Sequence, residues 1–140
     1  MEVKVKLNQI LGGIMPTKAH SLDAGFDIYT PHSFTVYAHD NAVIDTGVHF
    51  AIPAGHVGFL KSKSGLNMNH DLTAEGVVDA GYTGTVRVKL YNNGNKDYEF
   101  RAGDKVTQMV ILPIPEVKLV EVDTLEETER GTAGFGSTGR

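Results

Sequence analysis

The sequence predicts an all-β protein, either a sandwich or a barrel. Many short segments alternate polar with apolar residues, and they recur at a spacing of roughly 8–12 residues. Glycine, proline, asparagine and aspartate separate these segments, and these are the residues that turns favour. No longer stretch has the clean periodicity of an amphipathic helix. With 140 residues, the chain is long enough for one domain with its own hydrophobic core.

The predicted elements follow the alternating segments. A first strand is expected where Val3, Val5 and Leu7 alternate with lysines. Residues 65–72 have room for one helical turn, and the Asn93-Gly94 pair is a signal for a hairpin turn. The remaining strands are expected over residues 34–38, 43–50, 57–60, 77–78, 85–90 and 106–112, with a last strand that begins at residue 117.

The composition excludes several classes of function. A formal net charge of -4 argues against a general nucleic-acid binder. No apolar run approaches the roughly 18 residues of a membrane span, and residues 1–10 alternate instead of forming the apolar block of a signal peptide. The chain has no cysteine, which excludes disulfides and thiolate metal sites and fits the cytoplasm. We therefore expect a cytoplasmic protein that binds neither nucleic acid nor membrane.

Residues 76–84 are expected to form the bend of a hairpin with a working carboxylate. Val77 and Val78 favour a strand, and Asp79-Ala80-Gly81 has the chemistry of a turn. A carboxylate between valines and Tyr82 is expected to be partly desolvated, which makes it a stronger general base. The local sequence alone favours a plainer interpretation, in which the Asp79 side chain only stabilises the turn.

Two other segments have the chemistry of an anion site. Residues 61–65, KSKSG, put cations, hydroxyls and open backbone at the end of a strand, although a solvated loop explains them as well. Residues 134–139 match G-x-G-x-x-G, but no helix follows, so this is not a dinucleotide motif. A mobile tail of small residues can still wrap an anion, with Arg130 at its base and Phe135 as a stacking surface. The plainer alternative is a disordered tail.

Metal chemistry is limited to a hard cation. None of the six histidines has the spacing of a zinc site. A Mg²⁺ ion remains compatible with the sequence if substrate phosphates and water carry most of it, with Asp27 or Asp79 nearby.

Taken in order, five segments between Ala24 and Gly139 resemble the five motifs of the trimeric dUTP diphosphatases, or dUTPases. Each motif alone is a weak signal, but five in the expected order and spacing make a strong one. The segments are AGFDI at 24–28, KSGL at 63–66, GVVDAGYTG at 76–84, GDKVTQ at 103–108 and RGTAGFGSTG at 130–139.

The resemblance implies a distorted jelly-roll-like β-barrel or sandwich over residues 1–129 and a flexible lid over residues 130–140. It implies a homotrimer whose active sites are each built from all three chains. The implied reaction hydrolyses dUTP to dUMP and diphosphate, which limits uracil in DNA and supplies dUMP for thymidylate synthesis. Asp79 would activate water for attack on the α-phosphorus. Asp27 would hold, through water, a Mg²⁺ ion that bridges the triphosphate.

The resemblance also implies which residues bind substrate. Tyr82 would pack under the deoxyribose, where a ribose 2′-hydroxyl finds no partner, and Phe135 would stack on uracil. The full implied set is Lys63, Ser64, Gly65, Gly76, Val78, Tyr82, Lys89, Gln108, Arg130, Phe135, Gly136 and Ser137.

The chain departs from the family pattern at three positions. Lys63 stands where arginine is usual and lacks the bidentate fork of a guanidinium. Ser62 replaces a proline, and Thr73 stands where many members have an asparagine that contacts uracil. Two alternatives stay open. One is a dCTP deaminase of the same fold, which needs a glutamate near the position of Lys89. The other is a regulatory trimer that binds nucleotide.

Overall fold

The computed structural model describes residues 1–139 and confirms the all-β class. Ten strands and one short helix are found in this range. No helix in the described part of the chain has the length and apolar character that crossing a membrane requires. In chain order the elements are β1 (Lys4–Leu7), β2 (Gly25–Tyr29), β3 (Phe34–Val36), β4 (Asn41–Ala51), β5 (His56–Lys61), α1 (Ser64–His70), β6 (Leu72–Ala74), β7 (Gly76–Val78), β8 (Thr85–Asn92), β9 (Tyr98–Phe100) and β10 (Lys105–Pro113).

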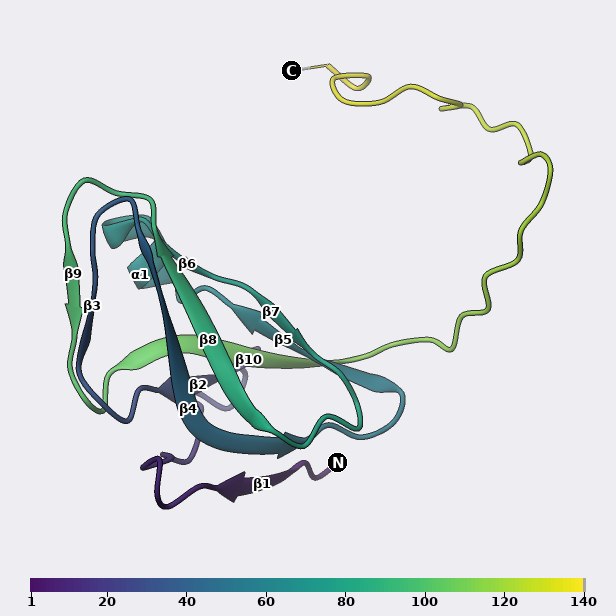
Figure 1. The fold of residues 1–140 in the computed structure, drawn as a ribbon. Coiled ribbons are helices and arrows are strands. Elements are labelled where there is room, and N and C mark those ends of the chain that lie inside the picture. The colour runs from purple at the N-terminus through teal and green to yellow at the C-terminus, as the bar shows by residue number, and fades with distance from the viewer. Residues whose placement is uncertain (140) are drawn as a thin grey trace.

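The strands form two four-stranded antiparallel sheets and a two-stranded ribbon (Figure 1). The strand order is β1-β4-β8-β6 in the first sheet and β2-β10-β5-β7 in the second, and β3 pairs with β9 in the ribbon. Strands that are close in sequence therefore often lie in different sheets. Such crossing connections between two sheets are typical of jelly-roll-like sandwiches.

One hydrophobic core lies between the elements of both sheets. Along β8, Val86, Val88 and Leu90 are buried while Arg87 and Lys89 face outward, as the two-residue period of a strand requires. Each such buried apolar side chain contributes about 1.5–3 kcal/mol to folding. The second sheet and the ribbon add Ile28, Val36, Leu60, Phe100, Val106 and Met109 to the same core.

The expected hairpin at residues 76–90 is wrong in its pairing. Both segments are strands, but β7 pairs with β5 in one sheet, whereas β8 pairs with β4 and β6 in the other. The bend after Val78 is therefore a connection between sheets. Local alternation predicts that a segment is a strand but does not select its partner, which depends on long-range packing.

Two further expectations are also wrong. The Asn93-Gly94 pair does not close a hairpin, because β8 ends at Asn92 and the following β9 pairs with β3. The last strand expected from residue 117 is absent, since residues 114–139 contain no strand and run away from the body of the molecule (Figure 1). Val117 and Leu119 accordingly remain 68% and 91% exposed.

The loop at Asn93-Gly94, where a hairpin turn was expected, is held by the buried side chain of Asn92. Its Nδ2 donates to the carbonyl oxygens of Val36 at 3.0 Å and Lys96 at 2.8 Å. Its Oδ1 accepts from the N–H of Gly94 at 3.0 Å. Asn92 thus joins the end of β8 to β3 and to the loop before β9.

Replacing Asn92 with alanine removes the partner of two carbonyl groups and one N–H at a buried position. We expect the free energy of unfolding to fall by about 2–3 kcal/mol, measured by urea denaturation with circular dichroism. The adjacent Asn93, which is exposed, is the matched control, and its change to alanine is expected to cost less than about 0.5 kcal/mol. Similar losses in the two variants would contradict this account of Asn92.

Candidate active site

The bend after β7 presents both of its predicted functional side chains to solvent. The Asp79 carbonyl accepts from the N–H of Tyr82 at 3.2 Å. Within this turn Gly81 has a φ of +88°, a conformation that glycine adopts without strain. The Asp79 carboxylate is exposed. The desolvation expected from the sequence is therefore not provided by its own chain, because the flanking Val77 is also 63% exposed.

Tyr82 is fixed across this bend. Its Oη donates to the carbonyl oxygen of Thr85 at 2.9 Å. The ring lies against the backbone of Gly84, where any Cβ atom would collide with it. A side chain at position 84 would therefore displace the Tyr82 ring from this place. Since Tyr82 is still 47% exposed, part of its ring remains available to a ligand.

A buried carboxylate brings two cations together at another place. Asp27 is only 4% exposed, and it forms ion pairs with Lys63 through Oδ1 and with Lys105 through Oδ2, the latter at 3.0 Å. Sequence reasoning did not single out Lys105. The available signal was its position directly after Gly103-Asp104 in the fourth motif segment.

Partly buried hydrogen bonds organise the segment that carries Lys63. The Gln108 side-chain Nε2 donates to the Ser62 carbonyl at 3.0 Å, and the N–H of Ala74 donates to the Ser62 hydroxyl at 3.0 Å. Helix α1 then begins at Ser64. Ser64 and Gly65 are exposed, and a Cβ at position 65 would meet nothing within 4 Å. Lysine ammonium groups, a hydroxyl and open backbone therefore face solvent together, as a phosphate site requires.

Asp79 and this cationic group lie at opposite ends of β7. The register places Gly76 opposite Leu60 and Val78 opposite Gly58. β5 ends at Lys61, so the segment with Lys63 begins near the Gly76 end of β7, whereas Asp79 follows Val78 at the other end. Asp79 and the cations are therefore separated by at least the span of three strand residues, roughly 10 Å. Figure 1 shows the same separation, with α1 at one end of the body and the loop between β7 and β8 at the other. One chain therefore holds two half-sites.

The other predicted residues on the body flank the bend. The side chain of Leu60 packs against Gly76, and Val78 is buried, so both can offer a ligand mainly backbone. Lys89 faces outward from β8, with its Nζ 5.1 Å from the centre of the Tyr91 ring. Arg87 lies on the same outward face and closer to the bend.

The predicted tail residues are brought to neither half-site. Arg130, Phe135, Gly136 and Ser137 are exposed, and they lie in the extended segment that leaves the body (Figure 1). The Arg130 Nε donates within the tail, to the Ala133 carbonyl at 2.9 Å. Arg140, the last residue of the predicted lid, lies outside the described residues.

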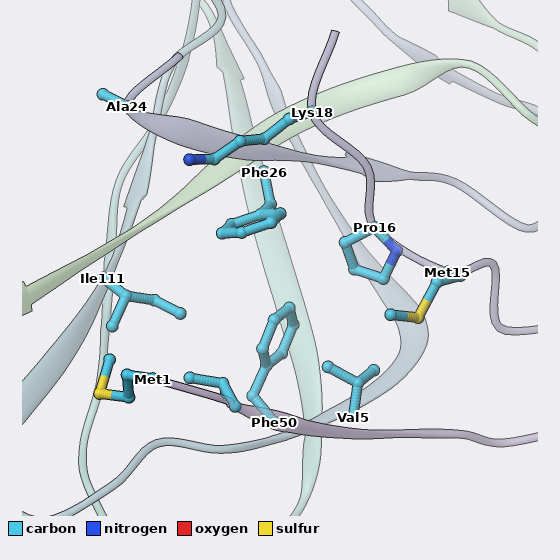
Figure 2. A pocket seen from close by; sticks show the side chains of 10 residues that line it. Met1, Val5, Met15, Pro16, Lys18, Ala24, Phe26, Phe50 and Ile111 are labelled. Carbon is cyan, nitrogen blue, oxygen red and sulfur yellow. The ribbon is translucent and has the colours of Figure 1, made fainter. Parts of the chain in front are cut away.

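An apolar pocket of about 270 Å³ lies beside the first motif segment, since Ala24 and Phe26 line it, but Asp27 and the cationic group are not among its lining residues. Figure 2 shows the rings of Phe26 and Phe50 facing it, with Ile111 and Val5 nearby. Lys18 crosses its rim, with its Nζ 4.8 Å from the centre of the Phe26 ring. Apart from Lys18, the lining has no polar side chain. It therefore lacks the set of polar groups that a nucleotide needs, so the pocket is not the candidate active site.

A resident metal does not fit the described residues well. Residues 1–139 contain no group of three or more histidine, aspartate or glutamate side chains arranged to hold an ion. Both oxygens of Asp27 already accept from ammonium groups. A metal ion would add a third positive charge beside the two lysines, which is electrostatically unfavourable. A Mg²⁺ ion fits better as part of a nucleotide substrate, held by phosphate oxygens and water.

The two lysines set the ionisation of Asp27. Burial raises the pKa of its carboxyl, but hydrogen bonds and the charges of Lys63 and Lys105 lower it more, so the pKa lies below its ordinary value of 3.8. In return, the hydrogen bond and charge of Asp27 raise the pKa of Lys105. Asp27 is therefore ionised at neutral pH, and Lys105 beside it is cationic.

This pKa shift predicts an acid-dependent part of the stability. The contribution of ionised Asp27 is complete above its unfolded pKa and is lost as the pH falls through the lower folded pKa, that is, below about pH 4. In Asp27→Asn, we expect the free energy of unfolding to be lower at pH 7 and to fall less steeply between pH 5 and pH 2. Urea titrations over this range measure the difference. Asp123→Asn, in the exposed tail, should keep the wild-type slope; an unchanged slope in Asp27→Asn would contradict the ion pairs.

Comparisons with known proteins agree on one family. The family model of the dUTPases matches residues 12–139. The chain is 39% identical over 131 residues to the deoxyuridine 5'-triphosphate nucleotidohydrolase of Candida albicans, covering 91% of this chain and 82% of the relative. It is 40% identical over 134 residues to the protein of that name from Leifsonia xyli, covering 93% and 88%.

Solved structures give the same result. A variant of the dUTPase of Staphylococcus bacteriophage 80alpha, solved with dUpNHpp, superposes with a TM-score of 0.91 at 30% identity over 99% of each chain. Another structure of that enzyme, with the same TM-score, identity and coverage, is presented as a phage dUTPase that controls transfer of virulence genes. A dUTPase from phage phi11 of S. aureus, at 29% identity, covers 91% of this chain and all of its own with a TM-score of 0.82, and reveals coordination of a structural Mg(II) ion. Because the family match spans nearly the whole chain and relatives near 40% identity align with most of its length, the chain belongs to the dUTPase family.

Proposed function

We propose that this chain hydrolyses dUTP to dUMP and diphosphate as a homotrimer in the cytoplasm. The reaction would limit uracil in DNA and supply dUMP for thymidylate synthesis. The observation that carries the proposal is the separation of Asp79 from the cationic group around Lys63 at opposite ends of β7. Each half has chemistry suited to one part of a nucleotide, and neither is complete alone. Association of chains is the simplest way to join them.

In the proposed reaction, Asp79 accepts a proton from a water molecule. The water oxygen forms a bond to the α-phosphorus, and the bond from this phosphorus to the oxygen bridging the β-phosphorus breaks, so that diphosphate leaves. One carboxylate base is sufficient when charge neutralisation and positioning lower most of the barrier. The desolvation that Asp79 lacks in a single chain would come from a neighbouring chain and from bound substrate.

The second half-site binds the triphosphate of a neighbouring chain's substrate. Lys63 and Lys105 supply positive charge, while Ser64 and the open backbone at Gly65 donate hydrogen bonds. Gln108 supports this segment through Ser62. When Mg²⁺ is bound to the triphosphate, it neutralises charge on the phosphate oxygens. Contact between that hydrated ion and Asp27 through a water molecule stays a prediction.

Selectivity would come from the bend and the lid. The Tyr82 ring would pack under deoxyribose, and the backbone at Gly76 and Val78 would meet the edge of uracil. Residues 130–140 would close over the site, with Arg130 on phosphate and Phe135 stacked on the base, and with Gly136 and Ser137 adding backbone N–H groups. Closure excludes water and strengthens the electrostatic contacts. Lys89 would reach the substrate only by leaving the Tyr91 ring, which its ammonium group contacts.

The two alternatives differ in what favours them. A dCTP deaminase would need a glutamate where Lys89 faces outward, and the comparisons above name dUTPases. A regulatory function in addition to hydrolysis is favoured by one observation, the similarity to a phage dUTPase presented as controlling gene transfer. It would use the same nucleotide site and does not replace the reaction.

A nucleotide panel tests the reaction and its base. We expect diphosphate release from dUTP with Mg²⁺ to exceed release from UTP, dTTP or dCTP by at least about 100-fold, because each mismatch leaves polar groups unpaired or collides with the bend. Asp79→Asn should bind dUpNHpp normally yet lose about 1,000-fold or more in kcat, since a general base contributes about 10²–10⁴-fold. Retained turnover in this variant would place the base elsewhere.

Mixed trimers test whether the two halves belong to different chains. Asp79→Asn and Lys63→Ala trimers should each be nearly inactive. After unfolding and refolding an equal mixture, random association gives each site an intact Asp79 and an intact Lys63 half the time each, so about one quarter of wild-type activity should return. Two halves from one chain would give no recovery. Refolding each variant alone is the control.

A further inference from the structure

Three side chains of β4 reach across to residues 83–86, where the chain leaves the bend after β7. The pairing of β4 with β8 shifts between Asp45 and His49, which is a β-bulge, and Gly47 inside it has a φ of +68°. Asp45 lies opposite Arg87 and His49 lies opposite Thr85. Between these two pairs, β4 therefore contains two more residues than β8 does. Bulges of this kind redirect side chains that regular pairing would send elsewhere.

The redirected side chains form hydrogen bonds with successive residues where the chain leaves the bend. The Thr46 hydroxyl donates to the Val86 carbonyl at 2.7 Å in the buried interior. Asp45 accepts from the Thr85 hydroxyl at 2.9 Å through Oδ2. His49 Nδ1 lies 2.7 Å from the Thr83 carbonyl oxygen. Because a carbonyl only accepts, His49 must carry its proton on Nδ1.

We propose that this bulge is a positioning element for the catalytic bend, and that His49 is the positioning residue that couples it to Tyr82. The inference rests on the proposed roles of Asp79 and Tyr82. Thr83 follows Tyr82 directly, and Thr85 supplies the carbonyl that accepts from the Tyr82 hydroxyl. Fixing Thr83 and Thr85 therefore fixes both ends of the segment on which the Tyr82 ring lies.

The location of the His49 hydrogen bond separates a role in positioning the bend from a contribution to folding stability. The Thr83 carbonyl belongs to the connection between sheets and is bound by a side chain instead of a ladder partner. The residue is only partly buried, so water can replace the lost bond at little cost to folding. The replacement would leave the bend free to shift, and a displacement near 1 Å at a reacting group can cost about 100-fold in rate.

The test compares two variants of His49 by two measurements. His49→Leu removes the donor, whereas His49→Asn keeps an amide N–H near the place of Nδ1. We expect His49→Leu to lower kcat for dUTP about tenfold and to lower the dUTP-over-UTP ratio of kcat/KM by a similar factor. We expect His49→Asn to keep both values within about threefold of wild type. The ratio from one sample is independent of the folded fraction, so partial misfolding does not mask the result.

His32→Leu, which changes an exposed histidine in the loop after β2, is the matched control and should match wild type. Unchanged selectivity in His49→Leu, or equal losses in the leucine and asparagine variants, would overturn the proposal. Asp79→Asn in the same assay separates the two levels of inference. If that variant is active, the proposed base is wrong. If it is inactive while His49→Leu behaves as wild type, only the positioning role fails.

Discussion

A buried carboxylate that balances two cations is the interaction on which the rest of this structure depends. Asp27 lies on β2, Lys63 follows β5 and Lys105 begins β10. Burying such a charge is tolerable only when it is paired, so these three segments must converge for the sheet edge to form. Without the acid, the two ammonium groups would repel each other. The arrangement thus concentrates positive charge beside the start of α1. The use of lysine in place of arginine fits this arrangement, because each ammonium can keep other N–H donors for an anion while Asp27 supplies the orientation that a guanidinium fork would provide.

The bend at the other end of β7 is constrained in a different way. Its entry belongs to one sheet through the pairing of Val78 with Gly58, and its exit belongs to the other sheet through β8. A segment held by two packed sheets can keep an exposed turn rigid without burying it. This explains how Asp79 can be accessible to water while the adjacent Tyr82 is fixed by Thr85 and Gly84. Rigid scaffolds commonly present functional groups on such connections.

The sequence predicted the strands better than their partners. Alternation at Val86, Val88 and Leu90 predicts which face of the strand is buried, and the structure confirms this face. The same signal says nothing about pairing, so the hairpins at residues 76–90 and at Asn93-Gly94 were wrong. Within the candidate site, motif resemblance selected Asp27, Asp79 and Tyr82. Lys105 lay inside the fourth motif segment without being singled out, and His49 lay outside every motif segment. Lys105 and His49 contact residues 78 and 34 positions away, and no spacing rule in one sequence connects such pairs. The expected desolvation of Asp79 failed for a related reason, since its local valines do not cover it.

The exposed regions of the single chain are the same regions that the proposed chemistry needs covered. Asp79 requires a less polar environment to act as an effective base, yet its own chain leaves it in solvent. Val117 and Leu119 alternate as a strand would, yet nothing in their own chain buries them. The hydrophobic gain from covering apolar surface between chains therefore acts in the same direction as the gain in reactivity at Asp79. In the proposed homotrimer, assembly and catalysis would be thermodynamically linked, because contacts made only in the assembled state would also create the environment in which the water molecule is activated. The proposed assembly thus accounts for the two incomplete halves on one chain, since a chain that has not associated would have little means to hydrolyse its substrate.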